Sequence, residues 1–323
     1  MKSSKLTLLT CSLLTLLPIS CSEDNGADHA VQYQPNTSQK ADTKFLRFTD
    51  ESRGEGVMEA AIATYEGKNG EKVELISAVH VADTAYYERL EKLFAGYDSV
   101  LYELIKGKGV KPPEKGRRKR GESGGMVSWF QRYMRDTLQL DFQLEAIDYR
   151  AKNFVHADLD AETFQRLSEE RGETIVQLML KLALAEFKIG KEGKSKTDQN
   201  IGLKLIAALF MPDSARALKY LFAQQLENME SLMAGLGEGP DGKGSVLLTE
   251  RNKKCMSVLR ERLKRGDKNI GVFYGGAHMA DLEKRIFKEI GFRRTGVRWE
   301  QAWVVRRAKQ PPAKKPAKKP AKK

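Results

Sequence analysis

Cysteine is scarce in this chain of 323 residues, and its placement excludes two kinds of stabilisation. The three cysteines are Cys11, Cys21 and Cys255, and the first two lie in a segment typical of an export signal. Cys255 would then be alone in the mature protein, so neither a disulfide framework nor a cysteine-based zinc site can form. We expect Cys255 to be a packed thiol within a helix.

The chain also lacks an apolar run long enough for a comfortable membrane span, which takes about 20 residues. Its apolar run Leu6–Leu17 follows two lysines and precedes small residues before Cys21, a layout that predicts a cleaved signal peptide over residues 1–20. The sequence Pro18-Ile19-Ser20-Cys21 is similar to a lipoprotein signal box, with Pro where Leu is usual. We therefore expect an exported protein of the bacterial cell envelope, anchored in the membrane by a lipid on Cys21. The alternative is cleavage elsewhere and a secreted or periplasmic product.

Negative charge is in deficit, but the excess of positive charge is confined to one end. The formal charge of +13 falls by nine, to +4, when the residues after Val305 are left out, so the folded part is not strongly basic and no specific nucleic-acid partner is indicated. Residues 307–323 repeat Pro-Ala-Lys-Lys and predict a disordered tail. This tail could contact anionic envelope polymers; the alternative is a solubilising tail with no dedicated partner. Residues 21–44 are polar and predict a flexible tether.

The segment between tether and tail, residues 45–306, predicts one domain with a sheet and helices. Two strands, 57–65 and 72–79, are joined by the turn Gly67-Lys68-Asn69-Gly70, a hairpin signal. A helix over 82–95 and a buried strand over 99–104 follow, and then a loop over 107–125 with the basic cluster Arg117-Arg118-Lys119-Arg120. We expect this cluster to be a solvated surface loop.

The remainder predicts a helical insert and a return to strands. Residues 126–236 are mainly amphipathic helix in pattern, which indicates an insert or cap over the sheet. Beyond it the pattern predicts a helix over 247–263, a strand over 269–274, a helix over 281–290 and a final strand pair over 292–305. The predicted fold class is α/β (α+β), with a mixed central sheet flanked by helices.

One local pattern occurs twice. A strand leads into His80-Val81-Ala82-Asp83 and a helix, and another leads toward His278-Met279-Ala280-Asp281 and a helix. Open α/β sheets place ligand sites beyond the carboxyl ends of their strands, so two such turns could direct both imidazoles to one point. We expect the two aspartates to be helix N-caps; the alternative is that they orient the imidazoles.

Glu103 supplies a third member, because it ends the strand that follows the first helix. Two histidines and one carboxylate leave positions on a divalent ion for water and substrate, as hydrolysis requires. The pattern therefore predicts a metal site formed by His80, Glu103 and His278, on condition that the two distant turns meet. The alternative is that each histidine only makes hydrogen bonds at its own turn.

At these residues the sequence resembles the TraB/GumN/TIKI family, whose members have two Gly-x-x-His turns, a Glu that ends an early strand and an Arg in the helix before the second turn. Gly275-Gly276-Ala277-His278 fits the turn fully, whereas Ser77-Ala78-Val79-His80 has Ser where Gly is usual. The Glu strand is matched by Val100–Leu104 and the Arg position by Glu250-Arg251-Asn252. The likeness covers residues 71–104 and 247–291.

The resemblance implies a sheet related to the erythromycin-esterase-like fold and, in the TIKI branch, metal-dependent proteolysis with manganese or cobalt. By that resemblance His80, Glu103 and His278 bind or activate the metal and its water, and Arg251 steadies an oxyanion or a carboxylate. The alternative for Arg251 is a surface ion pair. His156, in Val155-His156-Ala157-Asp158, is a further candidate for lining the cleft.

Three functions therefore remain open from the sequence. The first is an envelope-associated metal-dependent hydrolase that cleaves a peptide, or a small amide or ester, with manganese or cobalt and with zinc as a further candidate. The second is a non-catalytic, TraB-like peptide-binding or regulatory protein, whose affinity would not depend on a metal. The third is a surface-binding protein that acts through its Lys-rich tail.

Overall fold

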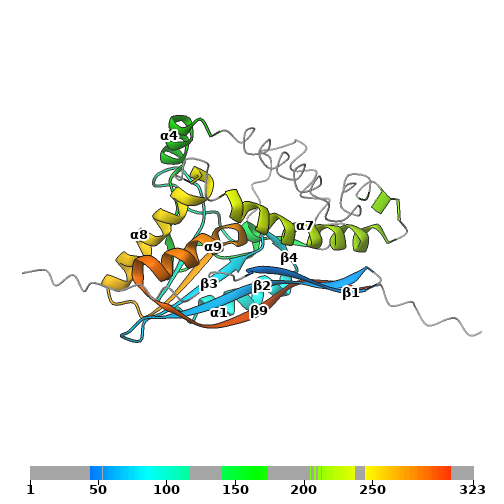
Figure 1. Cartoon of the computed structure of the whole chain (residues 1–323), viewed down its shortest axis with the longest axis horizontal. Coiled ribbons are helices and arrows are strands. Elements are labelled where there is room, and N and C mark those ends of the chain that lie inside the picture. The colour runs from blue at the N-terminus through cyan, green and yellow to red at the C-terminus, as the bar shows by residue number, and fades with distance from the viewer. Residues whose placement is uncertain are drawn as a thin grey trace, which may run out of the picture. The chain divides into compact units, whose positions relative to one another are not determined.

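A twelve-residue strand, β2 (Glu55–Glu66), organises the antiparallel half of the central sheet (Figure 1). One edge of β2 pairs along its length with β9 (Arg293–Val305), and the other edge pairs first with β1 (Leu46–Ser52) and then with β3 (Lys72–Ala78). The turn between β2 and β3 contains Gly70 at φ 81°, a left-handed backbone conformation that favours glycine. The predicted hairpin is confirmed.

The other half of the sheet is parallel. The strand β8 (Asn269–Gly275) lies between β3 and β5 (Ser99–Tyr102), and β7 (Phe154–His156) pairs with β5 at the edge. The sheet therefore has the order β1-β2-β3-β8-β5-β7, with β9 beside β2. This mixed sheet confirms the predicted α/β class. All four parallel strands end at the same edge, which is where ligand sites form in such sheets.

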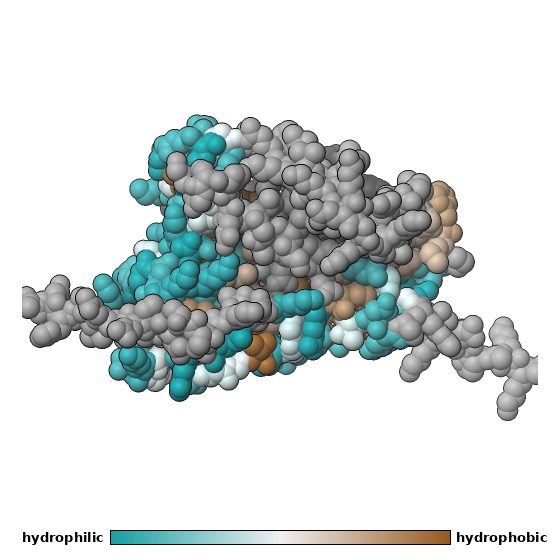
Figure 2. All heavy atoms as spheres, viewed as in Figure 1, coloured by the Kyte–Doolittle hydropathy of each residue, from teal (hydrophilic) through white to brown (hydrophobic). Residues whose placement is uncertain are grey.

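Helices cover both faces of this sheet. On β8 the side chain of Phe273 packs into the cluster that contains α1 (Thr84–Phe94), whereas Val272 packs on the opposite face against α8 (Arg251–Lys264) and α9 (Gly276–Arg285). In Figure 1, α8 and α9 lie on the same side of the sheet. The outward faces of α4 and α8 are hydrophilic (Figure 2). Cys255 is a buried free thiol in α8, as expected, and burial raises its pKa.

The remaining elements are short connections and one longer helix, α7. A two-stranded sheet and the helix that follows it lie near the first histidine turn, and a π-helical turn leads directly into α8. The bounds of these elements are β4 Val81–Ala82, β6 Asp141–Phe142, α3 Gln143–Ala146, α4 Ala161–Arg171, α7 Ser214–Leu236, η1 Val246–Glu250 and η2 Ile286–Ile290.

The computed structural model describes residues 44–52, 54–116, 140–173, 213–236 and 244–306, together with 204, 207, 208, 210 and 211. These residues belong to one unit, Pro35–Lys323. The predicted signal peptide, Cys21, most of the tether, the basic cluster Arg117–Arg120 and the tail over 307–323 lie outside the described residues, as does much of the predicted insert. No helix in the described ranges is both long and apolar enough to cross a membrane.

Three predicted elements differ from the structure. The segment 292–305 forms one strand, β9, rather than a strand pair. Gly296 is not at a turn but pairs with Thr64, and β9 stays paired with β2 through two register shifts. The predicted helix over 281–290 begins five residues earlier, at Gly276. A side chain at Gly276 would press on Leu46 and Ser77, so close packing selects glycine at a helical position where the sequence pattern indicates a break.

The third difference lies within the predicted insert. Residues Phe154–His156 were expected to be part of a helical region, but they form β7 and pair with β5. A three-residue strand carries no readable alternation, and its pairing is set by the neighbouring strand. The strand β1 was also missed, since its exposed residues Thr49 and Asp50 weaken the apolar pattern.

A buried carboxylate in this sheet predicts how stability changes in acid. Burial alone would raise the pKa of Glu74, but hydrogen bonds from Arg298, Tyr97 and Thr64 outweigh it and lower the pKa to about 2. Because the folded pKa lies below the unfolded value of about 4.3, Glu74 stabilises the fold above that value and loses this effect as the pH falls toward 2. In Glu74→Gln we expect a flatter decline of the free energy of unfolding between pH 5 and 2, measured by urea denaturation. An unchanged decline would contradict this assignment.

Candidate functional site

Each of the four parallel strands delivers a polar side chain to the same edge of the sheet. Glu103 follows β5 directly, Asp158 stands two residues after β7, His80 stands two residues after β3, and His278 stands three residues after β8. The strands β3, β8, β5 and β7 are neighbours in that order, so their ends bring these side chains together. The parallel half of the sheet therefore brings both histidine turns and Glu103 to one edge, as the sequence predicted.

Glu103 is the centre of this cluster. Its Oε1 accepts a hydrogen bond of 2.7 Å from Arg251 Nη2, and its Oε2 accepts one of 2.7 Å from the main-chain N–H of Gly275. His278 Nε2 lies 3.5 Å from Oε1. Burial would raise the pKa of Glu103, but the nearby His278, Arg251 and His80 hold it well below its usual range. The carboxylate is thus charged near neutral pH.

Arg251 joins two carboxylates, the fully buried Asp158 and the partly buried Glu103. Its Nε and Nη2 donate to Asp158 over 2.9 and 2.6 Å, and Nη2 also donates to Glu103. The side chain of Asp158 is fully buried and that of Arg251 is 6% exposed, so the alternative of a surface ion pair is wrong. Burial would lower the pKa of Arg251, but the two carboxylates raise it, and the guanidinium stays charged.

His278 is held in the first turn of α9 by a neighbouring helix. Its Nδ1 lies 2.8 Å from Asn252 Oδ1, and Asn252 Nδ2 donates to the main-chain oxygen of His278 over 3.2 Å. On the other side of the ring, Nε2 lies 3.4 Å from Arg251 Nη1. The ring is buried, so it faces the carboxylate cluster and not solvent.

His80, unlike His278, is exposed. Its Nδ1 lies 2.9 Å from Gln143 Oε1, and the main-chain N–H of Gln143 donates to the His80 oxygen over 3.0 Å. A methyl group added at Gly275 would lie 3.3 Å from both His80 Nε2 and Glu103 Oε2. The two atoms therefore border the same small space, which glycine at position 275 leaves open.

All four predicted site residues lie at this edge of the sheet. Of the two aspartates expected to be N-caps, one stands at an N-cap position and the other does not. Asp83 stands at the N-cap position of α1 without a side-chain bond to that helix, and instead accepts from Lys219 and the main chain of Val304. Asp281 lies inside α9, where it accepts from Asn252 and Arg285. Asp281 is thus no N-cap; it orients His278 through Asn252, in line with the alternative reading.

His156, the further candidate, is occupied elsewhere. Its Nε2 lies 2.7 Å from the main-chain oxygen of Leu104, and its ring packs against Tyr102. Burial lowers its pKa. The described contacts of His156 are structural and do not include Glu103 or the other two histidines.

Sequence reasoning gave no role to three residues of the cluster. Asp158 follows β7 as Glu103 follows β5, so a strand-end carboxylate was the available signal once β7 was known. Asn252 is adjacent to Arg251 on α8, but nothing in the sequence pairs it with His278. Gln143 has no local signal, because its approach to His80 depends on the pairing of β4 with β6.

The cluster contains the donor atoms that a divalent ion requires, but they do not lie close enough together to coordinate one ion. Within the described ranges, no three His, Cys, Asp or Glu side chains form a group that could hold a metal ion. His80, Glu103 and His278 still provide the donor types that such ions use, two imidazole nitrogens and a carboxylate. To bind one ion together, the two histidines would have to draw closer to Glu103.

The orphaned hydroxyl of Ser77 gives a stability prediction for the first turn. Ser77 is buried and its Oγ has no hydrogen-bond partner among the described residues. Since an unsatisfied buried hydroxyl is costly, we expect Ser77→Ala to raise the free energy of unfolding by about 1 kcal/mol. Ser77→Gly, which restores the usual residue of the turn, should gain less because glycine in a strand costs about 0.5–1 kcal/mol. Chemical denaturation of both variants checks this; a less stable Ser77→Ala protein would contradict it.

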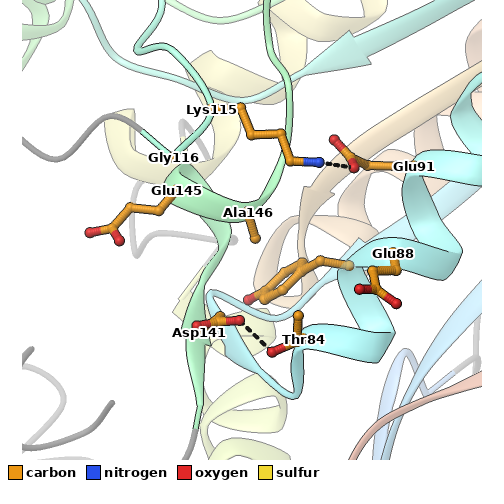
Figure 3. Close-up of a pocket in the computed structure, with 9 residues that line it drawn as sticks. Thr84, Glu88, Glu91, Lys115, Gly116, Asp141, Glu145 and Ala146 are labelled. Atoms are coloured by element: carbon orange, nitrogen blue, oxygen red, sulfur yellow. Dashed lines mark hydrogen bonds and ion pairs between the residues drawn. The ribbon is translucent and has the colours of Figure 1, made fainter. Parts of the chain in front are cut away.

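A separate pocket of about 290 Å³ lies between α1 and the segment Asp141–Ala146. Figure 3 shows Lys115 directed at Glu91 and Thr84 directed at Asp141 across it. None of the predicted site residues lines this pocket, so it is distinct from the cluster around Glu103. Its wall contains the same short segment that holds Gln143 against His80.

Comparisons with known proteins give no independent indication of family. No protein-family model, no curated protein and no solved structure matches the chain. The resemblance to the TraB/GumN/TIKI family therefore remains an inference from the motifs.

Proposed function

We propose that this protein is a metal-dependent hydrolase of the TraB/GumN/TIKI type that acts on peptide, amide or ester bonds. The observation that carries the proposal is the placement of two imidazoles near a charged carboxylate. His278 Nε2 lies 3.5 Å from Glu103 Oε1, and His80 Nε2 and Glu103 Oε2 border the same small space beside Gly275. Such a constellation at the carboxyl edge of parallel strands is typical of a reaction centre.

A divalent ion, with manganese or cobalt as first candidates and zinc as a further one, would be held by His80, Glu103 and His278. When bound, it would supply an activated water and polarise the attacked carbonyl group. The chain's own residues do the rest. Gly275 N–H and Arg251 fix the carboxylate, and Gly275 leaves room beside it because any side chain there would contact His80.

Arg251 contributes charge to the same centre. In the resemblance, this residue steadies an oxyanion or a substrate carboxylate. Among the described residues, Nη1 makes two long contacts of 3.4 Å, to Leu247 O and His278 Nε2, while Nε and Nη2 donate to Asp158 and Glu103. Nη1 is therefore the donor that could be directed to substrate without breaking the ion pairs that hold the guanidinium.

A second function, metal-independent binding of a peptide in the manner of TraB-like regulatory proteins, is favoured by one observation. Glu103 already has a cation beside it, because Arg251 donates directly to Oε1. A carboxylate so neutralised needs no metal ion to offset its charge.

Hydrolysis of a panel of peptides and simple esters separates the two functions. For the hydrolase we expect turnover that disappears after chelation and returns with manganese or cobalt. His156→Gln, which keeps an N–H donor for Leu104, serves as the control and should behave like the parent protein. Peptide affinity without turnover, unaffected by chelator, would refute the hydrolase and favour the binding protein.

For the location we propose a lipid anchor at Cys21 in the bacterial cell envelope, with the Lys-rich tail against anionic polymers. The support is the sequence alone: the signal pattern before Cys21 and the positive charge after Val305. Cys21→Ala should release the protein from the membrane fraction, and deletion after Val305 should weaken its retention on anionic polymer while leaving its circular dichroism unchanged. Membrane retention of Cys21→Ala would contradict the anchor.

A further inference from the structure

We propose that Asn252 and Gln143 are positioning residues that lock His278 and His80 in the same tautomer, with the proton on Nδ1 and Nε2 left unprotonated. Neutral histidine exists in two tautomers, and the partner of one ring nitrogen decides which is present. The inference rests on the proposed function for the use of Nε2, but the tautomers themselves depend only on the hydrogen bonds.

The case is strongest at His278, because the orientation of the Asn252 amide is fixed from outside the pair. Asn252 Nδ2 donates to Asp281 Oδ2 over 2.8 Å and to the main-chain oxygen of His278 over 3.2 Å, so both of its N–H groups are engaged. The remaining atom, Oδ1, can only accept. It lies 2.8 Å from Nδ1, which must therefore carry the proton.

The other side of the His278 ring has one donor and one acceptor nearby, so the assignment rests on Nδ1. Arg251 Nη1 lies 3.4 Å from Nε2, and a guanidinium nitrogen only donates. Glu103 Oε1, which can only accept, lies 3.5 Å from the same Nε2, so these two longer contacts offset each other. The shortest contact is the 2.8 Å one at Nδ1, where an unprotonated nitrogen would face the lone pairs of Asn252 Oδ1. Asp281 in turn accepts from Arg285 Nε over 2.7 Å, which keeps it an acceptor for Asn252.

His80 is held by an equivalent arrangement from a different element. Gln143 Nε2 donates to the Tyr149 hydroxyl over 2.8 Å, which leaves Oε1 to accept from His80 Nδ1. The Gln143 main chain donates to the His80 oxygen as well. Each histidine is thus bonded twice by one amide residue, once at Nδ1 and once at its own main-chain oxygen. Gln143 and Asn252 are both buried, and the contact between Asn252 and His278 is buried on both sides.

Two amides in place of two carboxylates have a chemical consequence. A carboxylate on Nδ1 would favour the charged imidazolium, whereas a neutral amide oxygen orients the ring without adding negative charge. Both Nε2 atoms then remain available as bases or as metal ligands.

His156 provides a comparison, because it should have the other tautomer. Its Nε2 lies 2.7 Å from the Leu104 carbonyl oxygen, which can only accept, so His156 must carry its proton on Nε2.

Nitrogen NMR of the chain labelled with ¹⁵N-histidine tests this directly. The chain has four histidines, and His29→Asn leaves the three that matter. In chelator-treated protein, at a pH where the rings are neutral, we expect the Nδ1–H tautomer for His80 and His278 and the Nε2–H tautomer for His156. An Nε2–H signal from either His80 or His278 would overturn the assignment for that residue.

Substitution of the amides shows whether they are the cause. Asn252→Ala should give His278 a substantial Nε2–H fraction while His80 and His156 stay unchanged, and Gln143→Leu should do the same for His80 alone. An unaltered His278 tautomer in Asn252→Ala would refute the role of Asn252. If that variant does not fold, the tautomers in the parent spectrum and the Gln143→Leu spectrum still test the proposal. Because no substrate is used, correct tautomers without turnover would refute only the proposed hydrolysis.

Discussion

Replacing Arg251 by alanine should lower the free energy of unfolding by about 3–5 kcal/mol, the usual cost of leaving a buried charge without its partner. The guanidinium is the shared partner of Asp158 and Glu103, and the Asp158 side chain is fully buried. Lysine should not rescue the protein, because a single ammonium cannot reproduce the bonds from two guanidinium nitrogens to Asp158. Guanidinium chloride denaturation measures the loss.

A surface arginine provides the matched control. Arg260 pairs with Glu289, and the two side chains are 42% and 32% exposed, so Arg260→Ala should cost less than about 1 kcal/mol. Acid provides a second check. Without Arg251 the pKa of Glu103 should rise, because one of the cations that lowers it is gone, so the difference in stability between variant and parent should shrink as the pH falls. A loss for Arg251→Ala as small as that for Arg260→Ala would contradict the buried network.

His80→Ala and His278→Ala should each lower kcat/KM by about 10²–10⁴-fold in any hydrolysis that the protein performs, the range lost with a positioned acid, base or ligand. Because both imidazoles serve one centre at Glu103, the double variant should lose little more than the worse single variant. Steady-state kinetics on the same substrate checks both statements. Effects that multiply in the double variant would contradict a shared centre.

The sequence predicted the site better than it predicted the elements around it. The Gly-rich turn before His278, the Glu at the end of β5 and the Arg at the start of α8 are local patterns, so they could be read without knowing the fold. Their convergence follows from a rule about parallel strands, and the structure places their side chains in contact at that edge. The mixed sheet and the β2–β3 hairpin were likewise evident from strand patterns and the turn at Gly70.

What the sequence could not show depends on contacts between distant segments. Asp158 belongs to the cluster because β7, three residues long, pairs with β5. Gln143 reaches His80 because β6 pairs with β4, and Asn252 reaches His278 because α8 packs beside α9. The start of α9 at Gly276 was missed for the same reason, since the packing of Leu46 and Ser77 against that residue is invisible in a local pattern.

Metal content, measured by atomic spectroscopy on protein that has been chelated and then equilibrated with manganese or cobalt, tests the central claim most directly. The parent protein should retain a single divalent ion through gel filtration, while His80→Ala and His278→Ala should lose it and His156→Gln should keep it. Full retention of the ion by both His80→Ala and His278→Ala would show that these imidazoles do not hold a metal at Glu103.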